Sequence, residues 1–118
     1  MHLIDSHTHI YGEEFDEDRD EMLARATAAS VGQMVLPNVD AASYPRVLDL
    51  CAAHPDRLFP TIGLHPTYVK EDYTSQLDYM ERELSQCPHV AIGEIGLDYY
   101  WDTTYQREQI EAFERQLH

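Results

Sequence analysis

The spacing of four β-rich runs restricts what this chain can fold into more than any other feature of its sequence. The runs are centred near Ile4, Val35, Pro60 and Ile92, so they recur at steps of 31, 25 and 32 residues. A helical pattern stands between each run and the next. Strands that alternate with single helices at this interval form βαβ units, and such units make a parallel sheet.

The residues that flank these runs set the expected bounds of the elements. The expected strands cover residues 3–7, 33–39, 58–64 and 90–95, and the expected helices cover about 16–30, 43 onwards, about 74–85 and 103 onwards. Gly32 follows the first helix, where glycine commonly takes a left-handed conformation. Thr103 and Gln106 have the spacing of a capping box at the start of the last helix. The apolar face expected for that helix consists of Ile110, Phe113 and Leu117.

Four units of this length correspond to half of a closed barrel. A TIM (β/α)8 barrel needs about 250 residues, or roughly 31 for each of its eight units. The 118 residues match the unit length and supply four units. We therefore predict an α/β fold of parallel βα units, in which residues 1–118 form a single half-barrel domain.

A half-barrel has exposed edges. Four parallel strands alone leave two edges unpaired and the inner face of the curl uncovered, which invites association. We expect either an excerpt of a longer barrel or a half that pairs with another chain, so self-association through the sheet edges is predicted. An open four-stranded sheet that stands alone is the third alternative.

The charge of the chain excludes one class of function. Eight basic and 22 acidic residues give a formal net charge of −14. A wide basic surface that binds nucleic-acid phosphates is therefore excluded, and a phosphate-bearing substrate would need a bound cation. No apolar run approaches the ~18 residues of a membrane span, and the start lacks the pattern of an export signal. We expect a soluble, cytoplasmic protein in which Cys51 and Cys87 are reduced thiols.

Two histidines stand at the end of the first predicted strand. Residues two apart in a strand point to the same side, so His7 and His9 converge, with Asp5 one step back. Neutral imidazoles suit first-row divalent metals. Active sites of barrel folds lie at the carboxyl ends of the strands. This position favours metal binding over the alternative that the two histidines occur at a strand end by chance and have no function.

An acidic residue ends the fourth predicted strand. Glu94 lies between Gly93 and Gly96, and burial of a lone carboxylate is costly unless a cation or a donor compensates for it. A carboxylate can also bridge two cations at the roughly 3.5–4 Å separation of two-metal hydrolases. The alternative is a surface turn with Glu94 in solvent. Asp98 either orients a metal ligand or caps the loop before the last helix.

A further histidine, His65, ends the third predicted strand and precedes a proline. It either contacts a substrate phosphate or acts in proton transfer, or it is only a turn residue. The positions of His2, His54 and His89 favour structural roles. The chain lacks the sequence motifs of covalent catalysis and of phosphate-binding loops.

These segments together resemble a known family. Residues 3–9, 63–66 and 93–100, in this order and spacing, resemble the TatD family of metal-dependent hydrolases and deoxyribonucleases, and the resemblance runs along the whole chain as an N-terminal half. The two-histidine motif is shared by the wider amidohydrolase superfamily, whereas the segment over 93–100 is far more selective. Tyr11 departs from the family pattern, in which an acidic or amide residue is frequent.

The resemblance implies a (β/α)8 barrel with two divalent cations, usually Mg²⁺, with Mn²⁺ and Zn²⁺ as alternatives. It implies that His7 and His9 are ligands of one cation, that Glu94 bridges both, and that His65 lines the site. Glu94 and His65 are then the catalytic candidates. Family members supply two more histidines and an aspartate from later strands, which this sequence does not contain, so activity of the 118-residue chain alone stays open.

The implied reaction is the hydrolysis of phosphodiester bonds in DNA, with metals that activate a bound water. We expect DNA or another phosphodiester to bind locally, as at a strand end. Two alternatives stay open. An amidohydrolase acting on C–N or ester bonds would share His7 and His9, but it normally has a lysine-based bridging ligand where this chain has Glu94. The other alternative is a non-catalytic half-barrel that pairs with another chain.

Overall fold

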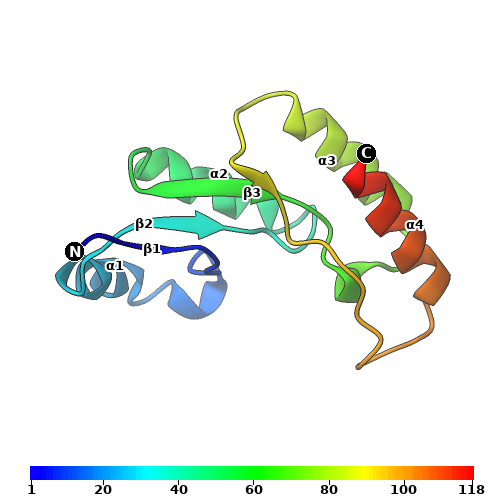
Figure 1. The fold of residues 1–118 in the computed structure, drawn as a ribbon, viewed down its shortest axis with the longest axis horizontal. Coiled ribbons are helices and arrows are strands. Elements are labelled where there is room, and N and C mark those ends of the chain that lie inside the picture. The colour runs from blue at the N-terminus through cyan, green and yellow to red at the C-terminus, as the bar shows by residue number, and fades with distance from the viewer.

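The four strands lie side by side in one sheet, in the same order as in the sequence (Figure 1). The computed structural model describes all of residues 1–118. The strands are β1 (Leu3–Asp5), β2 (Val31–Leu36), β3 (Leu58–Ile62) and β4 (Ala91–Ile92). Each strand pairs in parallel with the next. The predicted arrangement of parallel βα units is therefore confirmed.

One α-helix follows each strand. The α-helices are α1 (Arg19–Ala28), α2 (Tyr44–Ala53), α3 (Tyr73–Leu84) and α4 (Gln106–Leu117), and the 3₁₀ helices are η1 (Glu13–Phe15) and η2 (Pro66–Tyr68). Pro45 lies in the first turn of α2, where its missing N–H costs no helical hydrogen bond. α1 contacts β2, α2 contacts β3, and α3 contacts α4. No helix combines the length and the apolar character that a membrane span requires.

The core consists of two apolar clusters. The first joins α1 and α2 to the sheet and contains Ile10, Tyr11, Leu23, Met34, Leu36, Val47, Cys51 and Leu58. The second joins α3 and α4 to β3 and contains Tyr44, Ile62, Leu64, Val69, Leu77, Met80 and Ala112. The edge strands are much less covered, since Ile4 in β1 is 59% exposed and Ile92 in β4 is 41% exposed.

The turn between α1 and β2 differs from the prediction. Ser30, with a φ of 67°, takes the left-handed position that was expected at Gly32, and Gly32 lies inside β2. A Cβ at Gly32 would lie 2.0 Å from the His2 ring. The glycine therefore serves the close approach of a neighbouring side chain and does not end the helix.

The predicted strands are too long at their carboxyl ends. β2 ends at Leu36 because the next residue, Pro37, has no N–H for the ladder. The strand predicted over 90–95 is wrong beyond Ile92. Gly93 N still donates to Ile62 O at 2.9 Å, but Glu94 N donates to Asn38 O at 3.3 Å, so the chain leaves β3 at this point.

Two expectations about α4 are also wrong. The capping box of Thr103 and Gln106 is not formed, because Tyr105 is the residue at the N-cap of α4 and Gln106 is already the first residue of the helix. The predicted apolar face lies largely outward, with Ile110 42% and Leu117 61% exposed and Phe113 half-buried. The buried face consists of Gln109 and Ala112. The physical reason is that the Gln109 amide bonds both the N–H and the carbonyl of Asp98 at 2.9 Å, which turns this side of the helix inward.

Candidate metal centre

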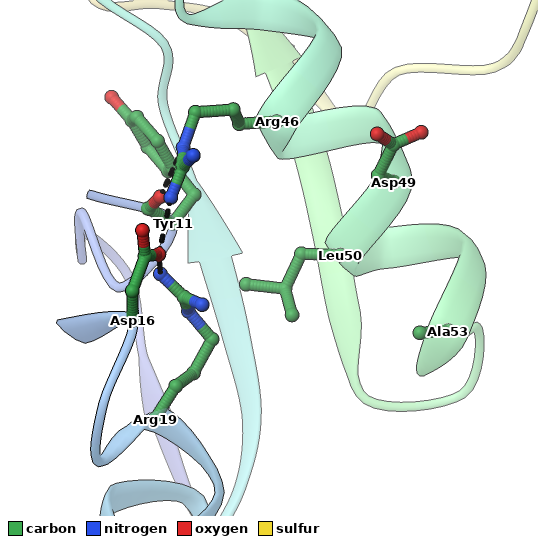
Figure 2. Close-up of a pocket in the computed structure, with 7 residues that line it drawn as sticks. All are labelled: Tyr11, Asp16, Arg19, Arg46, Asp49, Leu50 and Ala53. Atoms are coloured by element: carbon green, nitrogen blue, oxygen red, sulfur yellow. Dashed lines mark hydrogen bonds and ion pairs between the residues drawn. The ribbon is translucent and has the colours of Figure 1, made fainter. Parts of the chain in front are cut away.

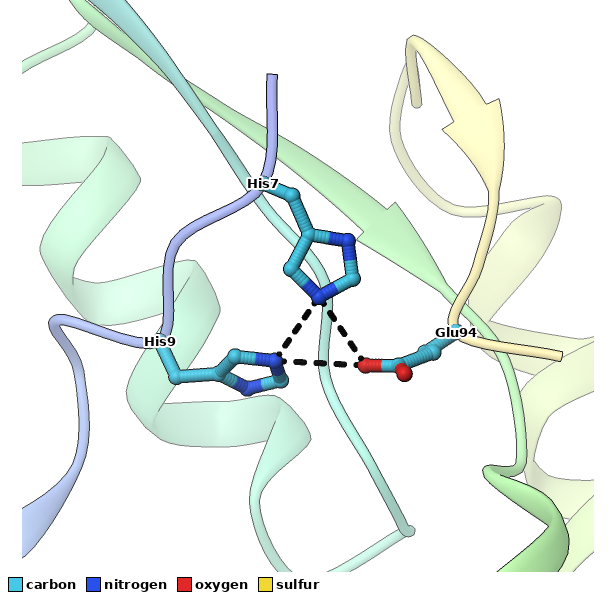
Figure 3. A group of neighbouring side chains, drawn as sticks. All are labelled: His7, His9 and Glu94. Carbon is cyan, nitrogen blue, oxygen red and sulfur yellow. Dashed lines mark hydrogen bonds and ion pairs between the residues drawn. The ribbon is translucent and has the colours of Figure 1, made fainter. Parts of the chain in front are cut away.

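His7 and His9 lie in the loop that follows β1, at the carboxyl end of the sheet. β1 ends at Asp5, whose Oδ1 accepts a hydrogen bond from His7 N at 3.1 Å. Thr8 N donates to Val35 O at 3.1 Å, which keeps this loop beside β2. The two rings point toward each other, and their Nε2 atoms are 3.0 Å apart (Figure 3). The predicted convergence is therefore present, although it arises in a loop and not in the strand.

Glu94 reaches the same point from the loop after β4 (Figure 3). Its Oε2 lies 3.1 Å from His7 Nε2 and 3.2 Å from His9 Nε2. The side chain is 26% exposed, so Glu94 lies at the mouth of the sheet and not in a surface turn in open solvent. Two imidazole nitrogens and a carboxylate oxygen thus form a nearly equilateral triangle.

Asn38 is a residue of this region that sequence reasoning missed. It is fully buried, and its Oδ1 accepts from Gly63 N at 2.9 Å while its Nδ2 donates to Asp40 O at 2.9 Å. Its carbonyl accepts from Glu94 N. Asn38 therefore ties together the loops after β2, β3 and β4. A polar amide at the end of an apolar run was the only sequence signal of this role.

Tyr11 determines which nitrogen of His9 is free. The Tyr11 hydroxyl donates its single proton to Pro37 O at 2.7 Å. It therefore accepts a hydrogen bond from His9 Nδ1, at 2.8 Å, which requires that the proton of the neutral His9 ring is on Nδ1. The lone pair of His9 Nε2 is then directed at His7 and Glu94. This is the arrangement by which a neighbouring group orients a metal-binding imidazole.

His65 has the opposite tautomer. Its Nδ1 accepts from Thr67 N at 3.1 Å and lies 2.8 Å from Thr67 Oγ1. The proton of the neutral ring is therefore on Nε2, which donates to Glu94 Oε1 at 3.1 Å. His65 thus offers a donor and not a lone pair to the site. Glu94 faces the two other histidines with one oxygen and His65 with the other.

Burial keeps the key groups in their neutral forms. It lowers the pKa of the His9 imidazole below its usual value of 6.5, against the opposite influence of Glu94. Burial, followed by the negative charge of Glu94, raises the pKa of the Tyr11 hydroxyl well above its usual range. A neutral imidazole is the form that binds metals, and a protonated tyrosine can bond Pro37 O while it accepts from His9.

The donor set fits a divalent cation. One atom each from His7, His9 and Glu94 can be chosen so that all three lie within 4.8 Å of one another. Ligands at 2.0–2.1 Å in an octahedral site are about 3.0 Å apart on each edge, which matches the observed 3.0–3.2 Å. The described residues form one such cluster. His65 borders it through Glu94, whereas Asp98 accepts from Tyr100 N at 2.9 Å and shapes its own loop.

Two arginines hold the loop that follows His9 (Figure 2). Arg19 donates to the carbonyls of Ile10 and Gly12, and Arg46 donates to the carbonyl of Tyr11. Both guanidinium groups also bond the Asp16 carboxylate, and these bonds, that of Arg19 first, hold the pKa of Asp16 below its usual range. These side chains line a cavity of about 330 Å³ on the outer side of the loop. The two arginines position the loop through these bonds.

Parallel βα units with two histidines and a glutamate at the carboxyl ends of the strands define a class of protein, the barrel-type metal-dependent hydrolases. The chain belongs to the TatD family, since the family model described as TatD related DNase matches residues 4–118. The resemblance predicted from the sequence is thereby confirmed.

Named relatives agree with this assignment. The chain is 31% identical over 115 residues to the uncharacterized metal-dependent hydrolase YabD of Bacillus subtilis, covering 98% of this chain and 45% of that protein. It is 32% identical over 116 residues to the 3′-5′ ssDNA/RNA exonuclease TatD of Erwinia tasmaniensis, covering 98% of this chain and 44% of that protein. The chain thus spans less than half the length of the curated relatives it matches.

Solved structures confirm the fold. The crystal structure of the TatD homologue YjjV from Escherichia coli superposes with a TM-score of 0.88 at 32% identity, over 98% of this chain and 45% of that one. A TatD family hydrolase from Entamoeba histolytica has the same fold, with a TM-score of 0.74 at 21% identity, over 98% of this chain and 44% of that one. The four βα units are therefore half of a TatD-type TIM barrel, as predicted.

Proposed function

We propose that residues 1–118 act as one domain that supplies half of the active site of a cytoplasmic phosphodiesterase, which hydrolyses DNA with two divalent cations. The observation that carries this proposal is the triangle of His7 Nε2, His9 Nε2 and Glu94 Oε2 at 3.0–3.2 Å. The relative from Erwinia tasmaniensis is named a 3′-5′ ssDNA/RNA exonuclease, which supports a nucleic-acid substrate.

His7, His9 and Glu94 would hold the first cation, and Glu94 would also be a ligand of the second. We propose Mg²⁺, as the family resemblance implies. The two imidazoles suit Mn²⁺ and Zn²⁺ as well, so these ions belong in the same test. When bound, such cations supply a water of lowered pKa and neutralise the charge of a phosphodiester.

The residues of the chain itself have separate roles in this proposal. His9, held by Tyr11, presents Nε2 as an acceptor, whereas His65, held by Thr67, presents Nε2–H as a donor. A donor beside Glu94 can bond a phosphate oxygen or protonate the departing oxygen. His65 is therefore proposed as the proton-donating residue and Glu94 as the bridging ligand.

The acidity of the chain limits how the substrate binds. With a net charge of −14, few phosphates along a nucleic acid can be neutralised by side chains. We propose that DNA is held at one or two phosphates by the cations, as at a strand end. Binding should then weaken only gently with salt, because the slope against salt scales with the number of phosphates neutralised.

The test is release of nucleotides from single-stranded DNA by the 118-residue chain, in Mg²⁺, Mn²⁺ or Zn²⁺ and in a chelator. Because the chain supplies only half of the proposed site, the expected rate is low, and whatever hydrolysis occurs should require metal and be lost in His7→Ala and in Glu94→Ala. His54→Ala is the matched control, because His54 lies at the end of α2 and should be dispensable. Hydrolysis unaffected by both site substitutions would contradict the assignment.

A second candidate function is a half-barrel that works only in association with another copy of this chain. The observation that favours it is the exposure of apolar side chains on both edge strands, with Ile4 at 59% and Ile92 at 41%. Such edges are templates for pairing with a further strand. Light scattering after gel filtration should show a dimer whose amount falls in an Ile4→Lys, Ile92→Lys variant. A monomer at all concentrations would exclude this candidate.

A further inference from the structure

A second cavity opens directly beside the candidate metal centre. It has a volume of about 250 Å³ and lies between the loops that follow β1, β2 and β3. One of its wall residues contacts a candidate ligand, and another contacts His65, which borders the centre. Tyr11 bonds His9 Nδ1 at 2.8 Å, and the Tyr68 ring stands edge-on to the His65 ring, with centroids 6.0 Å apart and an interplanar angle of 88°. The cavity is therefore connected to the centre through the side chains of Tyr11 and Tyr68.

Tyr68 provides an accessible aromatic wall. It is 43% exposed although it is a large apolar side chain, and it is held at its backbone by a hydrogen bond from Tyr68 N to His65 O at 2.9 Å. η2, on which it stands, is ordered further by the bonds between Thr67 and His65. A rigid, half-exposed ring of this kind is suited to stack a flat aromatic group.

The charges of the cavity argue against a phosphate as its occupant. Glu13 and Asp40 line it, and the one cationic group, Arg46, is already paired with Asp16 and with the carbonyl of Tyr11. One oxygen of Asp40 accepts from Ser43 N at 2.8 Å, which leaves the other to accept from a ligand. Carboxylates accept hydrogen bonds from the amino groups of bases, so a flat neutral group with N–H donors fits best.

The volume sets the size of that group. Small-molecule pockets are typically about 300–1,000 Å³, so a cavity of about 250 Å³ holds a single ring system and not a longer tract of nucleic acid.

We infer that this cavity binds one nucleobase of the substrate, stacked on Tyr68, while the phosphate attached to the same nucleoside lies at His7, His9 and Glu94. The inference rests on the proposed phosphodiesterase function and adds to it the way in which an acidic protein selects nucleic acid. Stacking on an aromatic ring tolerates every base, because each base has a π-face.

The experiment compares two probes that differ only in the base. Deoxyadenosine 5′-monophosphate and 2-deoxyribose 5-phosphate are titrated calorimetrically into the 118-residue chain saturated with Mn²⁺. We expect the nucleotide to bind roughly 5- to 150-fold more tightly, which is the range for stacking of one base. Tyr68→Ala should abolish most of this difference in affinity between the two probes. Tyr68→Phe, which keeps the ring, should retain the difference.

Tyr100→Ala is the matched control, since Tyr100 is 82% exposed and does not line the cavity. If Tyr100→Ala leaves the ratio of the two affinities unchanged, the result supports a base site at Tyr68. If Tyr100→Ala lowers this ratio as much as Tyr68→Ala does, the result overturns that location. Equal affinities of the two probes for the unsubstituted chain would overturn the base site and leave the phosphodiesterase proposal intact. Absence of binding by both probes would overturn both.

Discussion

The Tyr11 hydroxyl lies 2.8 Å from His9 Nδ1 and donates to Pro37 O at 2.7 Å. The family resemblance of the sequence leads us to expect an acidic or amide residue at this position, where the chain has Tyr11. Such a residue and a tyrosine hydroxyl share one property, an oxygen that can accept from His9 Nδ1. Tyr11 thus fixes the tautomer of His9 with a neutral hydroxyl.

Removal of the Tyr11 hydroxyl should weaken metal binding. In Tyr11→Phe the ring remains, but His9 Nδ1 loses its acceptor and the ring loses its fixed orientation. Loss of such a partner typically costs about 10- to 100-fold in metal affinity. Calorimetric titration with Mn²⁺ measures this change.

Tyr44→Phe is the control for Tyr11→Phe. Tyr44 is also a buried tyrosine that bonds a histidine, with its hydroxyl 2.6 Å from His89 Nε2, but it lies outside the centre. Removal of the Tyr44 hydroxyl should leave the affinity of the chain for Mn²⁺ unchanged. If the two variants bind Mn²⁺ equally well, Tyr11 does not position His9.

His65 and His7 should differ in what they contribute to metal binding. Because Thr67 fixes the His65 proton on Nε2, His65→Asn should bind Mn²⁺ as tightly as the parent, whereas His7→Ala should not. Hydrolysis should fall by about 10²- to 10⁴-fold in His65→Asn, as for loss of a proton-transfer group. A large loss of metal affinity in His65→Asn would show that this ring is a ligand.

Much of the fold and of the candidate site follows from the order of elements alone. Regularly spaced βα units must form a parallel sheet, and the carboxyl ends of parallel strands meet at one edge. Residues that follow the first and the fourth strand therefore lie at the same end of the sheet, and the curl of half a barrel brings them together although they are 85 positions apart in the sequence, as His9 and Glu94 are. The convergence of His7 and His9 was thus predicted from the strand period, and the place of Glu94 beside them from the family resemblance, although the strand bounds were wrong.

The contacts that orient these residues could not be predicted in the same way. Tyr11 and Asn38 act through hydrogen bonds to backbone atoms far along the chain, such as Pro37 O and Gly63 N. Nothing in local periodicity marks such partners. The buried face of α4 was mispredicted for a related reason. The spacing of apolar residues carries no information on the hydrogen bonds between Gln109 and the loop at Asp98.

Gln109 should matter more for stability than its polarity suggests. It is 4% exposed, and Gln109→Ala would leave the N–H and the carbonyl of Asp98 without their partner. A hydrogen bond contributes about 0.5–1.5 kcal/mol, so the loss of two should lower the free energy of unfolding by about 1–3 kcal/mol. Urea denaturation measures it, with Gln106→Ala on the exposed first turn of the same helix as control. Equal stabilities of the two variants would refute the role of Gln109.

His89 should make the fold sensitive to acid. Burial lowers the pKa of His89 below its usual value of 6.5, its Nε2 lies 2.6 Å from the Tyr44 hydroxyl, and its buried Nδ1 has no partner. The unfolded chain therefore takes up this proton before the folded chain does. The contribution of His89 to stability is complete above its unfolded pKa and is lost as the pH falls through the lower, folded pKa.

The measurement is the urea midpoint at about pH 7.5 and about pH 5.5, in a chelator so that bound metal plays no part. The parent should lose stability at the lower pH, and His89→Phe should lose less, because the titrating ring is gone. His9 also has a lowered pKa and contributes to the loss in both proteins, so the difference between them isolates His89. His54→Phe serves as control and should behave like the parent. An acid-induced loss of the same size in His89→Phe and in the parent would show that His89 does not couple protonation to folding.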